Sequence, residues 1–229
     1  TTDGNIDLGL VGGVGGSYQF TGGAFDYSGF SVASAGDVDG DGRDDLIIGA
    51  LGADGGAIDS GETYLILAKD LAALDAADNT TDGIINLGQV GNNGLSYQFT
   101  GGAAGDQAGI SVSSAGDVDG DGRDDLIIGA NRADGVGSDS GETYLILAAD
   151  LADLDAEDGT TDGNIDLGRV GGVDGSYQFT GGAANDQSGV SVASAGDVDG
   201  DGRDDLIIGA PFADGGGPNS GETYLILAK

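Results

Sequence analysis

The sequence predicts an all-β protein in which one unit of about 80 residues occurs three times. Three observations predict this class. The motif DVDGDGRDD begins at residues 37, 117 and 197. Short apolar runs, bounded by Asp and Gly, surround each copy and are rich in β-branched residues, which strands favour. The 49 glycines recur at matching places between these runs, which indicates turns of a folded protein rather than a disordered chain.

Four strands are expected in each unit. In the first unit they are SYQFT at residues 17–21, SVASAG at 31–36, DLIIGA at 45–50 and ETYLILA at 62–68. Apolar and polar residues alternate in these runs, as expected of strands, although residues 63–67 are apolar enough to be buried on both faces. A fifth strand is expected if residues 6–8 and their copies pair.

The linkers between units are expected to be helical for one or two turns. They occupy residues 70–78 and 150–158, and each begins with an Asp, which is a preferred N-cap residue. The units themselves span residues 1–79, 80–159 and 160–229, the third without its linker, and together form a single region. Four short strands per period are typical of a β-propeller or a solenoid.

The acidic motif predicts a site for a hard cation. Asp at its positions 1, 3, 5 and 9 supplies carboxylate oxygens, Gly at position 6 allows a sharp turn, and Arg at position 7 would offer its backbone carbonyl while its side chain points away. The predicted ligands are Asp37, Asp39, Asp41, Arg43 and Asp45 in the first copy; Asp117, Asp119, Asp121, Arg123 and Asp125 in the second; and Asp197, Asp199, Asp201, Arg203 and Asp205 in the third.

Two other interpretations of the motif are less favourable. A plain polar turn would also use Asp and Gly, but four neighbouring carboxylates repel one another without a counter-ion. An EF-hand needs a Glu at position 12 between two helices, whereas the residues here are Ile48, Ile128 and Ile208, each within the strand-like run LIIGA. The motif is therefore expected to join two strands as a hairpin.

Composition limits the partners and the chemistry. With 7 basic and 40 acidic residues the net charge is −33, which disfavours nucleic acid and anionic membranes as partners. No apolar run approaches the length of about 20 residues that spans a bilayer, so no membrane insertion is expected. The chain has no His and no Cys, so the usual acid–base and thiol routes are missing and no enzyme activity is expected.

The segment SGFSVASAGDVDGDGRDDLIIGA, followed by GETYLIL, resembles the FG-GAP repeat of the integrin α-chain β-propeller and its bacterial relatives. Gly29 and Phe30 correspond to the FG element, and Gly209, Ala210 and Pro211 to the GAP element. The resemblance extends over roughly 45 residues of every unit. It departs at residues 109–110 and 189–190, which are GI and GV, and in the longer linkers.

The resemblance implies a β-propeller with blades of four antiparallel strands, three blades per chain, and three Ca²⁺ ions in loops between the first and second strands. Two sets of loops would then form the upper, ligand-binding face for a protein or glycan; they are residues 51–60, 131–140 and 211–220, with 22–28, 101–108 and 181–188. Four aromatic residues outside the repeated positions fall in or beside these loops and are expected to fill contacts between blades, with contact to a ligand as the alternative; they are Phe25, Tyr27, Phe30 and Phe212. Three Asp residues are expected to brace the loops: Asp54, Asp134 and Asp214.

The order of the strands suggests how the blades close. The chain begins with an outer strand at residues 17–21 and ends after a third strand at 222–228, so the last blade lacks an outer strand and a spare one stands at the N-terminus. Propellers usually have about 4–8 blades. We therefore expect a six-bladed homodimer formed by exchange of outer strands; the alternative is a monomeric segment of a longer propeller.

Scarcity of free calcium in the cytosol favours an extracellular or cell-surface address, in a secreted bacterial protein. The function expected is a calcium-stabilised module for adhesion or for binding a protein or glycan. The alternative is a purely structural segment of a larger surface protein, because the three copies are nearly identical.

Overall fold

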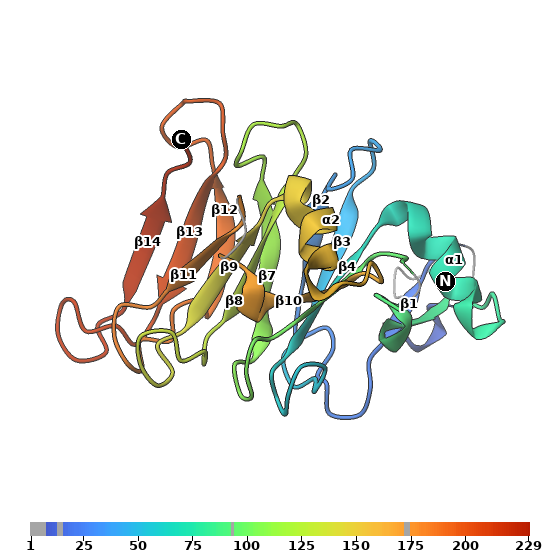
Figure 1. Ribbon diagram of the computed structural model, residues 1–229, viewed down its shortest axis with the longest axis horizontal. Helices are drawn as coiled ribbons and strands as arrows, with labels where there is room; N and C mark the ends of the chain where they lie inside the picture. Colours follow the sequence, from blue (N-terminus) through green and yellow to red (C-terminus); the bar gives the residue numbers. More distant parts are fainter. Residues whose placement is uncertain (1–7, 13–15, 93, 172–174) are drawn as a thin grey trace, which may run out of the picture.

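The computed structural model describes residues 8–12, 16–92, 94–171 and 175–229 of the chain. Short strands are its main regular elements, and three largely antiparallel sheets stand side by side across the molecule (Figure 1). We call these sheets blades. The first consists of β2 (Ser31–Gly36), β3 (Asp45–Ala50), β4 (Glu62–Ile66) and β6 (Tyr97–Thr100).

The second and third blades repeat this order. The second contains β7 (Ala108–Gly116), β8 (Asp125–Ala130), β9 (Glu142–Ile146) and β11 (Tyr177–Thr180). The third contains β12 (Ser191–Gly196), β13 (Asp205–Ala210) and β14 (Glu222–Ile226), and no fourth strand pairs with it among the described residues. The all-β class is confirmed, with largely antiparallel sheets of three to five strands, and the arrangement is consistent with propeller repeats.

The outer strand of each complete blade comes from the following unit of the sequence. β4 pairs with β6, with Glu62 opposite Thr100 and Tyr64 opposite Gln98, and β9 pairs with β11 in the same register. At the other end of the chain, β1 (Gln19–Thr21) pairs with β5 (Ile84–Asn86) and with no other strand that the structure describes. The predicted phase of the strands is therefore confirmed.

A fifth strand is present in two of the units. β5 runs parallel to β1, and β10 (Asn164–Asp166) runs parallel to β6. The expected first copy, at residues 6–8, lies outside the described residues except for Leu8, which falls in the 3₁₀ turn η1 (Leu8–Leu10). β10 thus extends the outer edge of the first blade with a strand of the third unit, and β5 lies in the same way beside β1.

Both linkers are helical, as predicted, but their first Asp acts differently from the expectation. The first linker contains η2 (Ala68–Asp70), α1 (Leu71–Asp75) and η3 (Ala76–Asp78). The second contains η5 (Ala148–Asp150), α2 (Leu151–Asp155) and η6 (Ala156–Asp158). One further 3₁₀ turn comes after each linker: η4 (Leu87–Gln89) after the first and η7 (Leu167–Arg169) after the second.

The expectation that these Asp side chains cap the helices is wrong. Asp70 occupies the N-cap position of α1 without a side-chain cap hydrogen bond. Its Oδ2 atom instead accepts hydrogen bonds from the backbone N–H of Ser96, at 2.8 Å, and from the Ser96 hydroxyl. The carboxylate thus ties the linker to the segment before β6, a tertiary contact that a local capping pattern does not reveal.

The core lies between the blades. We call the side of a blade that carries Ile47, Leu65 and Leu67 in the first blade its forward face, and the side that carries Val32 and Leu46 its rear face. Successive side chains of a strand point to opposite faces, and these strands carry apolar residues at successive positions. Both faces of a blade are therefore apolar. The forward face of the first blade is buried in one cluster with the rear-face residues Val112, Leu126 and Ile128 of the second. The second and third blades pack in the same way through Ile127, Leu145, Val192 and Leu206.

Glycine permits the close approach of neighbouring blades. A Cβ atom placed on Gly49 of β3 would lie 2.0 Å from the carbonyl oxygen of Gly109 in β7, and one on Gly129 would lie at the same distance from that of Gly189. The backbones therefore meet at points where any larger residue would collide with main-chain atoms.

Candidate metal centres

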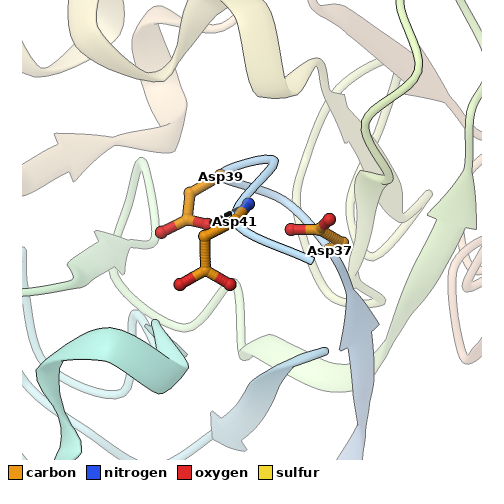
Figure 2. Close-up of side chains that lie close together, drawn as sticks. All are labelled: Asp37, Asp39 and Asp41. Carbon is orange, nitrogen blue, oxygen red and sulfur yellow. Dashed lines mark hydrogen bonds between the residues drawn. The ribbon is translucent and has the colours of Figure 1, made fainter. Parts of the chain in front are cut away.

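Each DVDGDGRDD motif forms the loop between the first two strands of a blade. The first begins where β2 ends at Gly36 and runs to Asp45, the first residue of β3, and the other copies occupy the same place in their blades. Figure 2 shows the first loop, in which the side chains of Asp37, Asp39 and Asp41 lie close together. The predicted hairpin position of the motif is confirmed.

Three acidic groups gather in these loops. In each group, one oxygen from every residue lies within 4.8 Å of those from the others. The groups are Asp37, Asp39 and Asp41; Asp117, Asp119 and Asp125; and Asp197, Asp199 and Asp205. The structure thus brings together three of the four predicted carboxylates at each site, although the third member differs in the first loop.

The loop backbone is held by its own carboxylates. Oδ2 of Asp37 accepts a hydrogen bond of 2.9 Å from the N–H of Gly42, and Oδ1 of Asp39 accepts one of 3.1 Å from the N–H of Asp41. Gly40 and Gly42 have φ angles of +74° and +87°, a region that glycine enters at little cost. The alternation of Asp and Gly therefore curls the chain so that the acidic side chains converge.

One carboxylate oxygen in the first loop lacks a partner. Oδ1 of Asp37 is buried and accepts no hydrogen bond within the part of the chain that the structure describes. A buried polar atom without a partner costs free energy, which a bound cation would recover. The other candidate donors at the site are also oxygens, the type that Ca²⁺ prefers, so these residues fit a hard cation.

The Asp at position 9 has a second role that the sequence did not reveal. Asp45 is fully buried; its Oδ2 accepts a hydrogen bond from the N–H of Val38 at 3.1 Å, and its Oδ1 accepts one from the N–H of Ala68 at 2.8 Å. Asp125 and Asp205 repeat both contacts in their own blades. This carboxylate therefore binds the loop to the end of the third strand, and burial raises the pKa of Asp125 to about 7.

The expectation that the Arg side chains point away from the loop is wrong in two copies. The Arg43 guanidinium donates to the carboxylate of Asp41, and Arg123 donates to that of Asp121. The hydrogen bond from Arg43 lowers the pKa of Asp41. Exposed pairs of this kind are weak and exchange readily, so they would not keep a cation from these carboxylates. Ligation through the Arg carbonyls stays a prediction.

The first loop also contacts a cation of the chain that the sequence analysis overlooked. Nζ of Lys69 lies 2.8 Å from Oδ2 of Asp39. The second unit has Ala149 at the equivalent position and the third has Lys229, so the second loop lacks this lysine. Its signal in the sequence was the basic residue directly after the repeated run TYLILA, present in the first and third units.

Position 8 of the motif joins neighbouring loops. Oδ2 of Asp124 accepts a hydrogen bond of 2.8 Å from the N–H of Asp37, and Oδ2 of Asp204 accepts one of 3.1 Å from the N–H of Asp117. No ligand role was predicted for this Asp, and the structure gives it a contact between blades. The three candidate centres are therefore linked in a row along one edge of the molecule.

The loops at the opposite ends of the strands are braced as predicted. Oδ1 of Asp54 accepts a hydrogen bond of 2.8 Å from the N–H of Asp59, and Asp134 and Asp214 make the equivalent contacts. Exposure is high for the aromatic residues of these loops, with Phe25 at 82% and Tyr27 at 62%. These two rings were expected to fill contacts between blades. Within the described residues they are instead exposed.

The comparisons with known proteins agree with this architecture. A family model described as "FG-GAP repeat" matches residues 28–66, 108–146 and 188–226, just over half of the 229 residues. The chain is also 29% identical over 190 residues to integrin alpha-PS5 of Drosophila melanogaster. That alignment covers 82% of this chain and 15% of the relative, so the chain spans less than a sixth of that protein's length.

Proposed function

The chain belongs to the FG-GAP repeat family, and from this we propose that it is a calcium-stabilised extracellular module for adhesion, binding a protein or glycan through its upper loops. The observation that carries the calcium part is the recurrence of three oxygen-only acidic groups at one position of the repeat. Repeats of this family often bind calcium. The proposed ligands are the Asp residues at motif positions 1, 3, 5 and 9, with the Arg carbonyls at position 7.

Bound calcium would act on stability rather than on chemistry. Each loop begins the second strand of its blade, and its position-9 carboxylate also holds the end of the third strand. An ion that binds the folded loop and not the unfolded chain stabilises the fold by mass action. It would also neutralise part of the repulsion within a chain of net charge −33.

The proposed binding surface is the set of upper loops. They differ most among the three units, and in the first blade they present the exposed rings of Phe25 and Tyr27. Exposed clusters of aromatic side chains, unlike single ones, often mark an interaction site. A surface location is supported by the similarity to an integrin alpha chain, and no described helix is long and apolar enough to cross a membrane.

A purely structural role is the second candidate. The metal loops and the braces at Asp54, Asp134 and Asp214 are repeated almost without change, as expected of units that supply architecture. A screen of immobilised glycans and extracellular-matrix proteins against the calcium-loaded chain separates the two candidates. Saturable binding that is lost on replacing Phe25 and Tyr27 by Ser supports the binding module, whereas no binding supports the structural segment.

Calorimetric titration of the metal-free chain with calcium chloride tests the metal sites. The proposal expects three equivalents of calcium and a melting temperature that falls when a chelator is added. A titration with magnesium chloride serves as the control, because Mg²⁺ is smaller and gives up its water reluctantly. No heat of binding and an unchanged melting curve in chelator would refute calcium stabilisation.

A further inference from the structure

The forward face of the third blade is left uncovered by the residues that the structure describes. In the first and second blades the three forward-face residues are between 0% and 7% exposed. In the third blade, Ile207, Leu225 and Leu227 are 38%, 48% and 39% exposed. The same apolar residues are therefore exposed in the third blade, at one end of the row, and buried in the first two blades.

The rear face of the first blade shows the complementary exposure. Val112 and Leu126 are 5% and 0% exposed in the second blade, whereas Val32 and Leu46 are 65% and 36% exposed in the first. The outer part of this face is covered, because Ile85 and Leu87 with the partly buried Phe20 form one cluster with the core of the first blade. The uncovered part is where the inner three strands of a preceding blade would stand.

Polar groups at the two ends also lack the partners that their copies have. Asp124 and Asp204 accept hydrogen bonds from the N–H groups of Asp37 and Asp117 in the preceding blade. Within the described residues, the carboxylate of Asp44 has no such partner, and neither has the N–H of Asp197. An unmatched acceptor therefore lies at one end and the matching donor at the other.

We propose that the chain binds a second copy of itself through these two faces, so that two chains close into a ring of six blades. Strand β14 of each copy would pair with β1 of the other and complete the third blade. The register follows from β4 and β6: Glu222 would lie opposite Thr21, and Tyr224 opposite Gln19. The Asp44 carboxylate of one copy would accept a hydrogen bond from the N–H of Asp197 in the other.

The space around the glycines supports this assignment. A Cβ atom on Gly49 or Gly129 would meet the backbone of the next blade at 2.0 Å, whereas one on Gly209 meets nothing closer than 3.6 Å. Likewise a Cβ on Gly36 or Gly116 would strike the Asp of the next blade, and none of the described atoms lies within 4 Å of one on Gly196. Gly209 is thus a glycine that no neighbour among the described residues requires, whereas Gly196 also needs to be glycine for its φ of +69°.

Two-fold closure would cover both open faces at once. Each copy brings one forward face, one rear face, one edge of β14 and one edge of β1, so a two-fold axis satisfies all of them together. Three copies would form nine blades, outside the usual range of about 4–8. The interface would continue the packing already present between the blades of one chain, and the inference does not depend on the proposed calcium or ligand binding.

The test is the mass of the full chain, measured by size exclusion with light scattering in calcium buffer at several micromolar concentrations. We expect a species of twice the chain mass of 22.3 kDa. Gly209→Ala should raise the dissociation constant of the dimer at least about tenfold, because overpacking at a backbone contact is unfavourable while the folded chain alone has room for the methyl group. Asp44→Ala should also weaken the dimer, by loss of the inter-blade hydrogen bond.

Gly182→Ala is the matched control, since Gly182 is exposed and a Cβ there would meet only Asp186, at 3.4 Å. Circular dichroism establishes that each variant is folded. A wild-type mass of one chain or of three chains would overturn the proposal. A folded Gly209→Ala variant that dimerises as strongly as the Gly182→Ala control would also overturn it.

Discussion

The Asp125 carboxylate accepts a hydrogen bond of 2.8 Å from the N–H of Ala148, 23 residues further along the chain. Its other oxygen accepts one of 2.9 Å from the N–H of Val118 inside the acidic loop. A single buried side chain thus fixes both the shape of the loop and the end of the strand β9. Loop geometry and blade stability are therefore coupled even before a metal ion binds.

Asp125→Asn is expected to destabilise the chain by about 1–3 kcal/mol in chelator, because the amide nitrogen cannot accept and one buried N–H loses its partner. Urea unfolding followed by circular dichroism measures this loss. Asp153→Asn makes the same substitution at an exposed helix position and should leave the midpoint almost unchanged. Equal midpoints for the two variants would contradict a bracing role for Asp125.

Asp117→Ala is expected to remove one calcium site. Position 1 of the motif contributes both to the acidic group and to the hydrogen bonds that shape the loop, with Asp117 accepting from Gly120 and Gly122. Calorimetry should then give two equivalents of calcium in place of the three expected for the wild type. A stoichiometry still equal to that of the wild type would exclude Asp117 as a ligand, and Asp153→Ala controls for the loss of one negative charge.

Gly49→Ala is expected to destabilise the contact between the first two blades by about 1–3 kcal/mol or more, because its methyl group would collide with the Gly109 carbonyl. Backbone atoms cannot turn aside as a side chain can. The measurement is the denaturation midpoint, with Gly182→Ala as a control at an open position. A Gly49→Ala protein as stable as this control would show that the blades do not approach as closely as described.

Glu62→Gln is expected to stabilise the chain increasingly as the pH rises. Burial raises the pKa of Glu62, although the hydrogen bond from the Tyr64 hydroxyl opposes the shift. A carboxyl group whose pKa is higher in the folded state favours folding when protonated, and this contribution is lost as the pH rises above its usual value of 4.5. The variant keeps an acceptor for Tyr64 without the buried charge.

Melting temperatures of wild type and Glu62→Gln between pH 4 and pH 8 measure this effect as a difference, so that shared titrations cancel. The difference should be small at the acid end and should grow toward neutral pH. Glu157→Gln, at an exposed position, should show no such trend. A constant difference across the range would contradict the burial argument.

Local patterns in the sequence predicted a large part of this structure. The strands β2, β3 and β4 and the loops between them follow from short apolar runs and from Asp and Gly at fixed spacing. The outer strand that a blade takes from the following unit was also predictable. The order of apolar runs shows that this strand comes before the acidic loop of its own unit. These features depend on neighbouring residues and recur identically in each unit.

The contacts of individual carboxylates were not predictable in this way. Nothing in the motif distinguishes Asp45, which braces two backbone segments, from Asp39, which meets Lys69. The expectation for Asp70 failed for the same reason, since its partner Ser96 lies 26 residues away. Equivalent side chains are chemically identical, and only the packing of distant segments decides which partner each one finds.

The sequence by itself determined the repeated unit, its strands, the turns and the oxygen-rich chemistry of the acidic loop, since all of these follow from short-range spacing. The tertiary structure alone decided which faces are covered. Val112 and Val32 are valines at equivalent positions of their strands, yet Val112 is 5% and Val32 is 65% exposed. Burial depends on what stands next to a blade, and a unit's sequence does not record whether it has a neighbour.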